Sequence, residues 1–253
     1  MAALASLRSE ILKIKRTASL YFTIVGAAIV PLLYLINVLS GDIDSTKTDP
    51  FNAMFKLGAQ MNGLVFFPLY VVLICTLLPQ IEYKNNTWKQ LFASPQSKQR
   101  IFVAKFLTIQ LLLILFLITN LMFMFLAAVI GHFAMPELDL LNQPLSVQTI
   151  IVNAANTYVC VFAICVVQFW LGLRSRNFLI PIAVGLVLWF VGIMMVLEYK
   201  SVFAKYYPYS YNIFAVTPNL KNQLNIVEWM SLAFGVGMGM LGFLDFRRKK
   251  VTN

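Results

Sequence analysis

Charged residues are scarce in this chain. Only 12% of its 253 residues are Asp, Glu, Lys or Arg, whereas 60% are hydrophobic and the mean hydropathy is +0.77. A soluble domain of this size does not need so much apolar surface, and the apolar residues form uninterrupted blocks. The composition therefore excludes a soluble protein and indicates a polytopic membrane protein.

Residues that commonly carry chemistry are also few. His132 is the only histidine, and the three cysteines, Cys75, Cys160 and Cys165, lie inside apolar blocks, where buried thiols are expected. The sequence contains no Walker A, H-E-x-x-H or G-x-S-x-G motif and no paired intramembrane carboxylate. We therefore expect no catalytic residue, no metal site and no cofactor in this chain, so that any ATPase site would belong to another polypeptide.

Two motif matches are misleading. Residues 237–242 satisfy G-x-G-x-x-G, but no strand precedes them and they lie within an apolar run, so a dinucleotide site is not expected. The spacing of Gly235, Gly239 and Gly242 instead predicts a flat face for close helix packing. Asn85-Asn86-Thr87 spells a glycosylation sequon, but the orientation argued below places it in the cytoplasm.

Six apolar runs are long enough to cross a membrane as helices. A helix needs about 20 apolar residues to span a hydrocarbon core of about 30 Å. The six runs are residues 20–39, 63–80, 101–130, 150–173, 178–197 and 227–244. We predict an all-α membrane protein in which residues 1–253 form a single transmembrane domain.

The first residues predict a helix that lies on the membrane surface. Within residues 1–17, Leu7, Ile11 and Ile14 recur at helical spacing, and the basic residues lie largely off that stripe. A signal peptide is the competing interpretation. The run 20–39 is too long for a signal-peptide core, however, and the residues after it make no convincing cleavage site.

The distribution of basic residues predicts the orientation. Fifteen of the twenty Lys and Arg residues lie in the N-terminus, in residues 82–105, in the turn after the fourth run and in the C-terminus. The positive-inside rule then places both termini in the cytoplasm. The net charge of +10 is explained by these loops and tails, so no nucleic-acid partner is expected.

Residues 82–100 form the longest polar break that is also basic. Thr87 can cap a short helix with an apolar face of Trp88, Leu91 and Phe92, and Pro95 would end it. Two interpretations are open. The helix is either an interfacial connector with its tryptophan at the lipid headgroups, or a docking element for a soluble partner.

The order of residues in this stretch resembles the coupling-helix loop of type-2 ABC export permeases. Glu82, Thr87 and Pro95 match that loop by position, and Asn86 stands where the family usually has glycine. Asparagine tolerates a left-handed backbone better than most residues, so the turn is compatible with the exchange. The length, span count and predicted orientation resemble the same family, including small bacterial permeases of the bacteriocin- or lantibiotic-immunity type.

The resemblance implies a function. The chain would be the membrane subunit of an exporter of amphiphilic molecules, such as a peptide antibiotic or a lipid-like compound, in the bacterial inner membrane. Its partners would be a second permease copy or a related permease and a cytoplasmic ABC ATPase that binds ATP and Mg²⁺. The residues implied in ATPase coupling are Glu82, Thr87, Trp88, Leu91, Phe92 and Pro95. A non-transport membrane scaffold or sensor and an intramembrane enzyme are the alternatives.

Polar residues inside the apolar runs suggest two further features. Asn120, Asn153, Asn156 and Gln168 are amides that either bond across helices or line a substrate path. The loop 198–226 is rich in aromatic residues around Pro208. It forms either an aromatic belt at the outer surface or, as the resemblance implies, a re-entrant segment between spans five and six.

Overall fold

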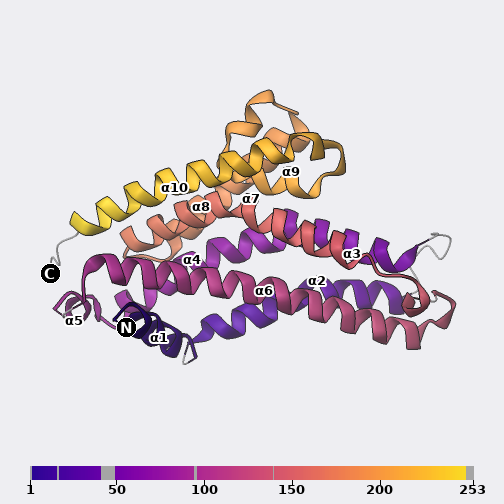
Figure 1. Ribbon diagram of the computed structural model, residues 1–253, viewed down its shortest axis with the longest axis horizontal. Coiled ribbons are helices and arrows are strands. Elements are labelled where there is room, and N and C mark those ends of the chain that lie inside the picture. The colour runs from indigo at the N-terminus through magenta and orange to yellow at the C-terminus, as the bar shows by residue number, and fades with distance from the viewer. Residues whose placement is uncertain (1, 16, 41–48, 94–95, 139, 249–253) are drawn as a thin grey trace.

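The computed structural model describes residues 2–15, 17–40, 49–93, 96–138 and 140–248 (Figure 1). Every regular element within these ranges is a helix, and six helical stretches are long and apolar enough to cross a membrane. The prediction of an all-α protein with six candidate spans is therefore confirmed.

Five of the six candidate spans are longer than the apolar runs that predicted them. The first three candidate spans comprise α2 (Ala18–Leu39), the continuous helical stretch of α3 (Pro50–Met61), η1 (Asn62–Phe66) and α4 (Phe67–Lys84), and α6 (Lys98–Ala134). The last three comprise α7 (Val147–Arg174), α8 (Leu179–Ile193) with η4 (Met194–Glu198), and η7 (Pro218–Gln223) with α10 (Leu224–Arg248). The remaining elements are α1 (Ala2–Lys15), α5 (Trp88–Ala93), η2 (Pro136–Leu138), η3 (Leu140–Asn142), η5 (Val202–Tyr206), η6 (Pro208–Ser210) and α9 (Tyr211–Val216).

The second span begins earlier than the sequence indicated. Residues 50–61, which lie outside the predicted apolar run, form α3 and continue through η1 into α4 without a break. The Asp49 carboxylate accepts a hydrogen bond from the backbone N–H of Asn52 (3.1 Å), and Pro50 occupies the first helical turn. The buried residues Phe51, Met54 and Phe55 follow helical spacing, so α3 is amphipathic. A search for uninterrupted apolar runs does not detect such a helix, because polar residues lie between the apolar ones.

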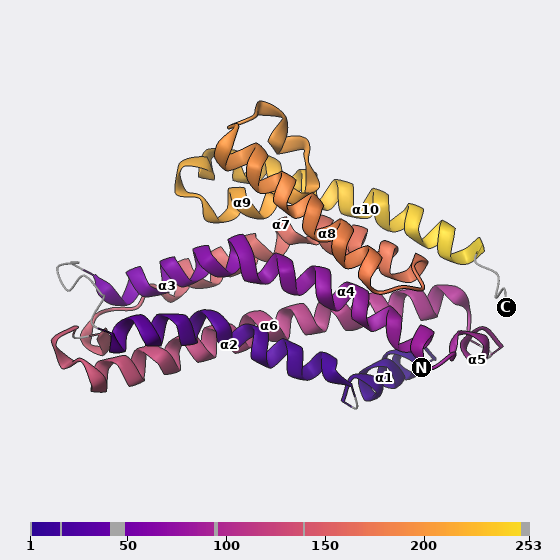
Figure 2. The same cartoon turned by 180° about the vertical axis from the view of Figure 1, so that it is seen from behind.

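The first described helix and the end of the last one lie at the same end of the bundle. Figures 1 and 2 show α1, α5 and the C-terminal end of α10 together, whereas α3 lies toward the opposite end. We call these the α5 end and the α3 end. Along the bundle, α2 packs on α6, and α7 packs against both α4 and α10.

Two prolines free backbone carbonyls that side chains from other helices then satisfy. Pro31 in α2 has no N–H to give to the carbonyl of Ala27, and the Asn120 side chain donates to that oxygen instead (2.9 Å). Pro68 likewise leaves the Leu64 carbonyl open. Trp189 (3.2 Å) and Asn212 (3.4 Å) donate to it. Such repairs are expected where no water reaches the backbone.

The aromatic loop between α8 and α10 folds back onto the bundle. Tyr209, Tyr211 and Asn212 are buried, and the Tyr207 hydroxyl donates to the Leu188 carbonyl (2.9 Å). In Figures 1 and 2 the loop lies beside the middle of the bundle and does not extend as far as the α3 end. Its aromatic residues are thus partly core residues of the bundle.

Candidate coupling site

The short helix α5 is attached to the bundle by its first residue. Asn86 adopts a left-handed backbone (φ 53°), which agrees with the turn expected where the sequence departs from glycine. Trp88, two residues later, is only 7% exposed, and its ring packs against Tyr83 (5.5 Å between centroids) and Phe246 (5.9 Å). Lys89 and Gln90 are exposed, so α5 presents a polar face outward and an aromatic side chain inward.

Four charged side chains form a network of ion pairs beneath α5. Lys105 Nζ contacts Glu10 Oε2 (2.8 Å) and Glu82 Oε1 (3.0 Å), and Lys13 Nζ contacts Glu10 Oε1 (2.8 Å) and Glu82 Oε1 (2.7 Å). We call Glu10, Lys13, Glu82 and Lys105 the ion cluster. It joins α1, the end of α4 and the start of α6, three segments that are distant in sequence.

The ion cluster is electrically balanced and largely buried. The side chains of Glu82 and Lys105 are each 1% exposed, and two carboxylates face two ammonium groups. A buried charge is tolerated only when it is paired and hydrogen-bonded, which explains the closed arrangement. Burial by itself lowers the pKa of Lys13, but its hydrogen bonds and the charges of Glu10 and Glu82 outweigh burial and raise that pKa above its ordinary value.

Thr87 connects the ion cluster to α5. Its hydroxyl donates a hydrogen bond to Glu82 Oε2, and its backbone N–H donates to the Glu82 carbonyl (3.0 Å). In turn, the Thr87 carbonyl accepts from the backbone N–H of Leu91 within α5 (2.9 Å). The hydrogen bonds of Thr87 thus link α5 to the Glu82 carboxylate, which also contacts Lys13 of α1 and Lys105 of α6.

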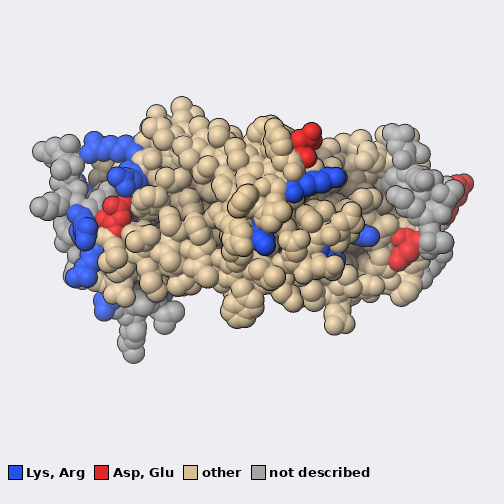
Figure 3. Space-filling model, turned by 90° about the horizontal axis from the view of Figure 1, so that it is seen from above, with Lys and Arg blue, Asp and Glu red and all other residues tan. Residues whose placement is uncertain are grey.

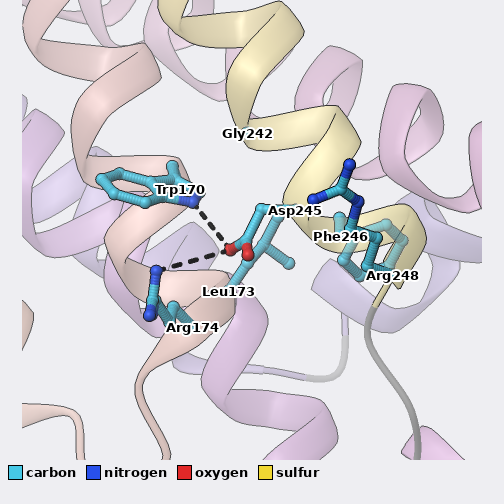
Figure 4. Close-up of a pocket in the computed structure, with 7 residues that line it drawn as sticks. All are labelled: Trp170, Leu173, Arg174, Gly242, Asp245, Phe246 and Arg248. Carbon is cyan, nitrogen blue, oxygen red and sulfur yellow. Dashed lines mark hydrogen bonds and ion pairs between the residues drawn. The ribbon is translucent and has the colours of Figure 1, made fainter.

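The end of α10 is fixed to the same region. Figure 4 shows the Asp245 carboxylate between Trp170 and Arg174 of α7, accepting from Trp170 Nε1 (3.0 Å) and lying 3.9 Å from Arg174 Nη1. Lys98, in the first turn of α6, donates to the carbonyl of Arg247 (3.0 Å). Trp170, Arg174 and Asp245 line a pocket of about 220 Å³, together with Arg248.

The structure brings together part of the predicted coupling set. Glu82, Thr87 and Trp88 meet at one junction, and Leu91 is half-buried in α5. Phe92 lies in α5, but its side chain and the whole of Pro95 lie outside the described residues.

Sequence reasoning missed three members of the ion cluster. Glu10 is the only acid in residues 1–17 and precedes Lys13 by three positions, which was the available signal. Lys105 lies inside an apolar run, where an unpaired lysine is costly and a partner should have been sought. The α1 face turned inward contains Ser6, Glu10 and Ile14, while the predicted stripe residues Leu7 and Ile11 are half-buried.

The amides considered for a substrate path do not converge on one site. Asn120 and Asn153 line the same pocket at the α3 end. Asn156 faces α10, where its amide nitrogen donates to Glu228 Oε1 (3.2 Å). Gln168 is fully buried and donates to the Tyr209 hydroxyl (2.9 Å), which ties α7 to the aromatic loop.

Three of the four glycines of α10, those of the predicted packing face, lie against α7. A Cβ added to Gly235 would come within 2.5 Å of the Phe162 ring, and one added to Gly242 would come within 3.3 Å of Trp170. Gly239 is less tightly packed, with 3.7 Å to Val166. Because these positions carry no side chain, the two helices approach closely along this line.

The fold and this junction define a multi-pass, α-helical membrane protein without a catalytic constellation among its described residues. A family model described as "ABC-2 family transporter protein" matches residues 6–192, about three quarters of the chain. The chain belongs to the ABC-2 transporter family, and it is an ABC transporter membrane subunit. No curated protein matches the chain. The matched range includes α5 and the whole ion cluster, whereas the aromatic loop and α10 follow it.

Proposed function

We propose that this chain is the permease subunit of an ATP-driven exporter and that α5 is its coupling helix. A separate cytoplasmic ATPase, carrying ATP and Mg²⁺, would dock on the exposed face of α5, and a second copy or a related permease would complete the transporter. The observation that carries this proposal is the junction itself. A short exposed helix is joined to three membrane-associated helices through one buried carboxylate, Glu82.

The geometry supports a route for the mechanical step. Closure of the ATPase subunits would press on Lys89 and Gln90, which are exposed. Trp88 and Thr87 would carry the displacement inward, because one packs on Phe246 and the other bonds to Glu82. The ion cluster would then move the ends of α1, α4 and α6 as a unit, since pulling one member out of the cluster would leave a buried charge without its partners.

This proposal changes the role expected for Trp88. From the sequence, Trp88 was expected either to enter a groove on the ATPase or to sit at the lipid headgroups. With 7% of its surface exposed, it has little area left for either contact. We propose that Trp88 fastens α5 to the bundle and that the outward polar face recognises the partner.

The docking proposal is tested by co-purification from the native membrane. Lys89→Glu with Gln90→Glu places two negative changes on the exposed face of α5 and should release a soluble ATPase that co-purifies with the wild type. The matched control, Lys200→Glu with Gln223→Glu, makes the same charge changes on exposed residues far along the chain and should retain it. An ATPase that stays bound and fully coupled in the first variant would refute docking on this face.

The two alternative functions predict different outcomes in the same preparation. A scaffold or sensor would show no nucleotide-dependent turnover with any ATPase partner. An intramembrane enzyme would be active without one. Export of an amphiphilic peptide or lipid-like molecule would instead require the chain, the ATPase and ATP together.

We further propose that the α5 end faces the cytoplasm of a bacterial inner membrane. Figure 3 shows Lys and Arg side chains gathered at this end, which supports the orientation under the positive-inside rule. A single cysteine at Lys221 should react with an impermeant reagent in intact cells, whereas cysteines at Lys89 or Ser175 should not. The native cysteines are buried and give little background. Labelling at position 89 from outside would overturn the orientation.

A further inference from the structure

A second pocket lies between α3, α6 and α7, on the side of the bundle away from α5. Its volume is about 310 Å³, which is within the usual range of small-molecule sites. Its walls combine apolar side chains, among them Leu117 and Met124, with several amides and two lysines. Pockets with a largely apolar lining and a few placed polar groups commonly bind amphiphilic ligands.

The polar groups of the pocket floor are held in fixed orientations. The carbonyl of Ala27, freed by Pro31, accepts from the Asn120 amide nitrogen (2.9 Å). The Asn120 oxygen must therefore face Asn62, whose own amide nitrogen donates to it (3.2 Å). This relay leaves the Asn62 side-chain oxygen as an acceptor.

Within the described part of the chain, the side-chain oxygen of Asn62 is a buried acceptor without a donor. Asn62 is only 5% exposed and lines the pocket, and its Oδ1 has no hydrogen-bond partner among the described residues. An unsatisfied buried acceptor is costly unless a bound molecule donates to it. Asn62 also begins the π-helical turn η1, a geometry that often marks functional sites.

The mouth of the pocket is positively charged. Lys56 and Lys221 both line it and are exposed. The third charged lining residue, Asp49, already accepts hydrogen bonds from the backbone (3.1 Å) and side chain (2.8 Å) of Asn52. The two lysines can therefore bind an anionic group of a ligand. The Asn62 oxygen can accept a hydrogen bond from a donor group of the same ligand.

We propose that this pocket binds a lipid with an anionic headgroup. The phosphate would lie between Lys56 and Lys221, a headgroup hydroxyl would donate to Asn62, and part of an acyl chain would follow the apolar wall. A volume of about 310 Å³ holds a headgroup but not a peptide of ten or more residues. That this lipid is also an exported substrate rests on the proposed function, whereas its binding does not.

The test measures lipid binding to the purified full chain without any ATPase. Native mass spectrometry compares phosphatidylglycerol with phosphatidylcholine of identical acyl chains. We expect about thirtyfold tighter binding of phosphatidylglycerol, which corresponds to two lysines that each contribute about 1 kcal/mol. Lys56→Gln with Lys221→Gln should reduce phosphatidylglycerol to the level of phosphatidylcholine. The control, Lys200→Gln with Lys205→Gln, removes two lysines outside the pocket and should leave the preference intact.

Two further measurements distinguish binding in the pocket from adsorption of lipid to the protein surface. Thr149→Trp introduces a bulky side chain at an exposed lining position and should weaken the binding of both lipids. Soluble glycerol phosphate should compete poorly, because it lacks the acyl chain. Equal affinity for the two lipids, a preference that survives loss of both lysines, or unchanged binding in Thr149→Trp would each overturn the proposal. Competition by glycerol phosphate as strong as by the lipid would assign the site to a free phosphate and would also refute it.

This test and the docking test fail independently. Loss of lipid preference would leave the ATPase bound through α5, and loss of the ATPase would leave lipid binding unchanged. Only export of the lipid depends on both.

Discussion

The α5 end and the α3 end satisfy their buried polar groups in different ways. At the α5 end, four ionised side chains contact one another at 2.7–3.0 Å, with two charges of each sign. At the α3 end, neutral amides form an open relay that ends at the Asn62 oxygen. The closed cluster has little capacity for a ligand, whereas the relay retains an acceptor for one.

The two ends also differ in the free-energy cost of leaving a buried polar group unpaired. A charge buried in apolar surroundings is far more costly to leave unpaired than an amide, so the four charges of the ion cluster are expected to remain paired. Hydrogen bonds of polar side chains between membrane helices average only about 0.6 kcal/mol. The α5 end is therefore suited to transmit a displacement, and the α3 end is suited to adapt to a bound molecule.

The largest expected effect is at Lys105. Lys105→Met removes the ammonium group that contacts both Glu10 and Glu82, and leaves two buried carboxylates with only Lys13. Loss of one partner from a buried ion pair costs about 3–5 kcal/mol. We expect a large drop in thermal stability of the purified protein, or a loss of accumulation in the membrane. Lys84→Met, at an exposed position on the last turn of α4, should change little.

A double-mutant cycle sharpens this prediction. Glu82→Gln combined with Lys105→Met removes one charge of each sign, so the double variant should be more stable than the Lys105→Met variant alone. Strictly additive losses would show that the two residues do not interact. The contrast between the two ends would then have no energetic basis.

The next largest effect is at Trp88. Trp88→Ala removes a ring that packs on Tyr83 and Phe246, at a cost of about 3 kcal/mol for a buried aromatic side chain. Because α5 is short and peripheral, we expect local release of this helix, measured as faster hydrogen exchange of residues 86–93. With Leu91→Ala added, the folded, membrane-inserted protein should no longer retain its ATPase.

Trp229 provides the matched control. It is 74% exposed on α10, so Trp229→Ala should leave exchange in α5 unchanged. Slow exchange of α5 in the Trp88→Ala variant would show that other contacts hold the helix. In that case the ion cluster would not receive its displacement through Trp88.

The sequence predicts the fold better than it predicts the site. Six spans follow from apolar run length, which depends only on local composition and bilayer thickness. The turn at Asn86 and the helix after it follow from local backbone preferences. A role for Glu82 was indicated only by the resemblance to a family loop, whereas Thr87 was also predicted to cap the short helix.

The remaining features depend on contacts between distant segments. The pairing of Glu10 with Lys105 spans 95 positions, and no local pattern specifies it. Asn120 was expected to contact a neighbouring helix or a substrate. Its partner is a carbonyl that a proline in α2 leaves open, and only the register between α2 and α6 brings the two together. The orphan acceptor of Asn62 follows from that register in turn.

The smallest expected effect tests the amide relay. Asn120→Leu keeps a similar volume but leaves the Ala27 carbonyl and the Asn62 amide nitrogen without this partner, which should cost about 1 kcal/mol. Pro31→Ala restores an N–H that can bond to the Ala27 carbonyl within α2, so Asn120→Leu should cost less in that background. Thermal unfolding of the wild type, both single variants and the double variant measures this difference. If Asn120→Leu destabilises the protein as much as Lys105→Met does, the amide relay is as rigid as the ion cluster and the two ends do not differ in kind.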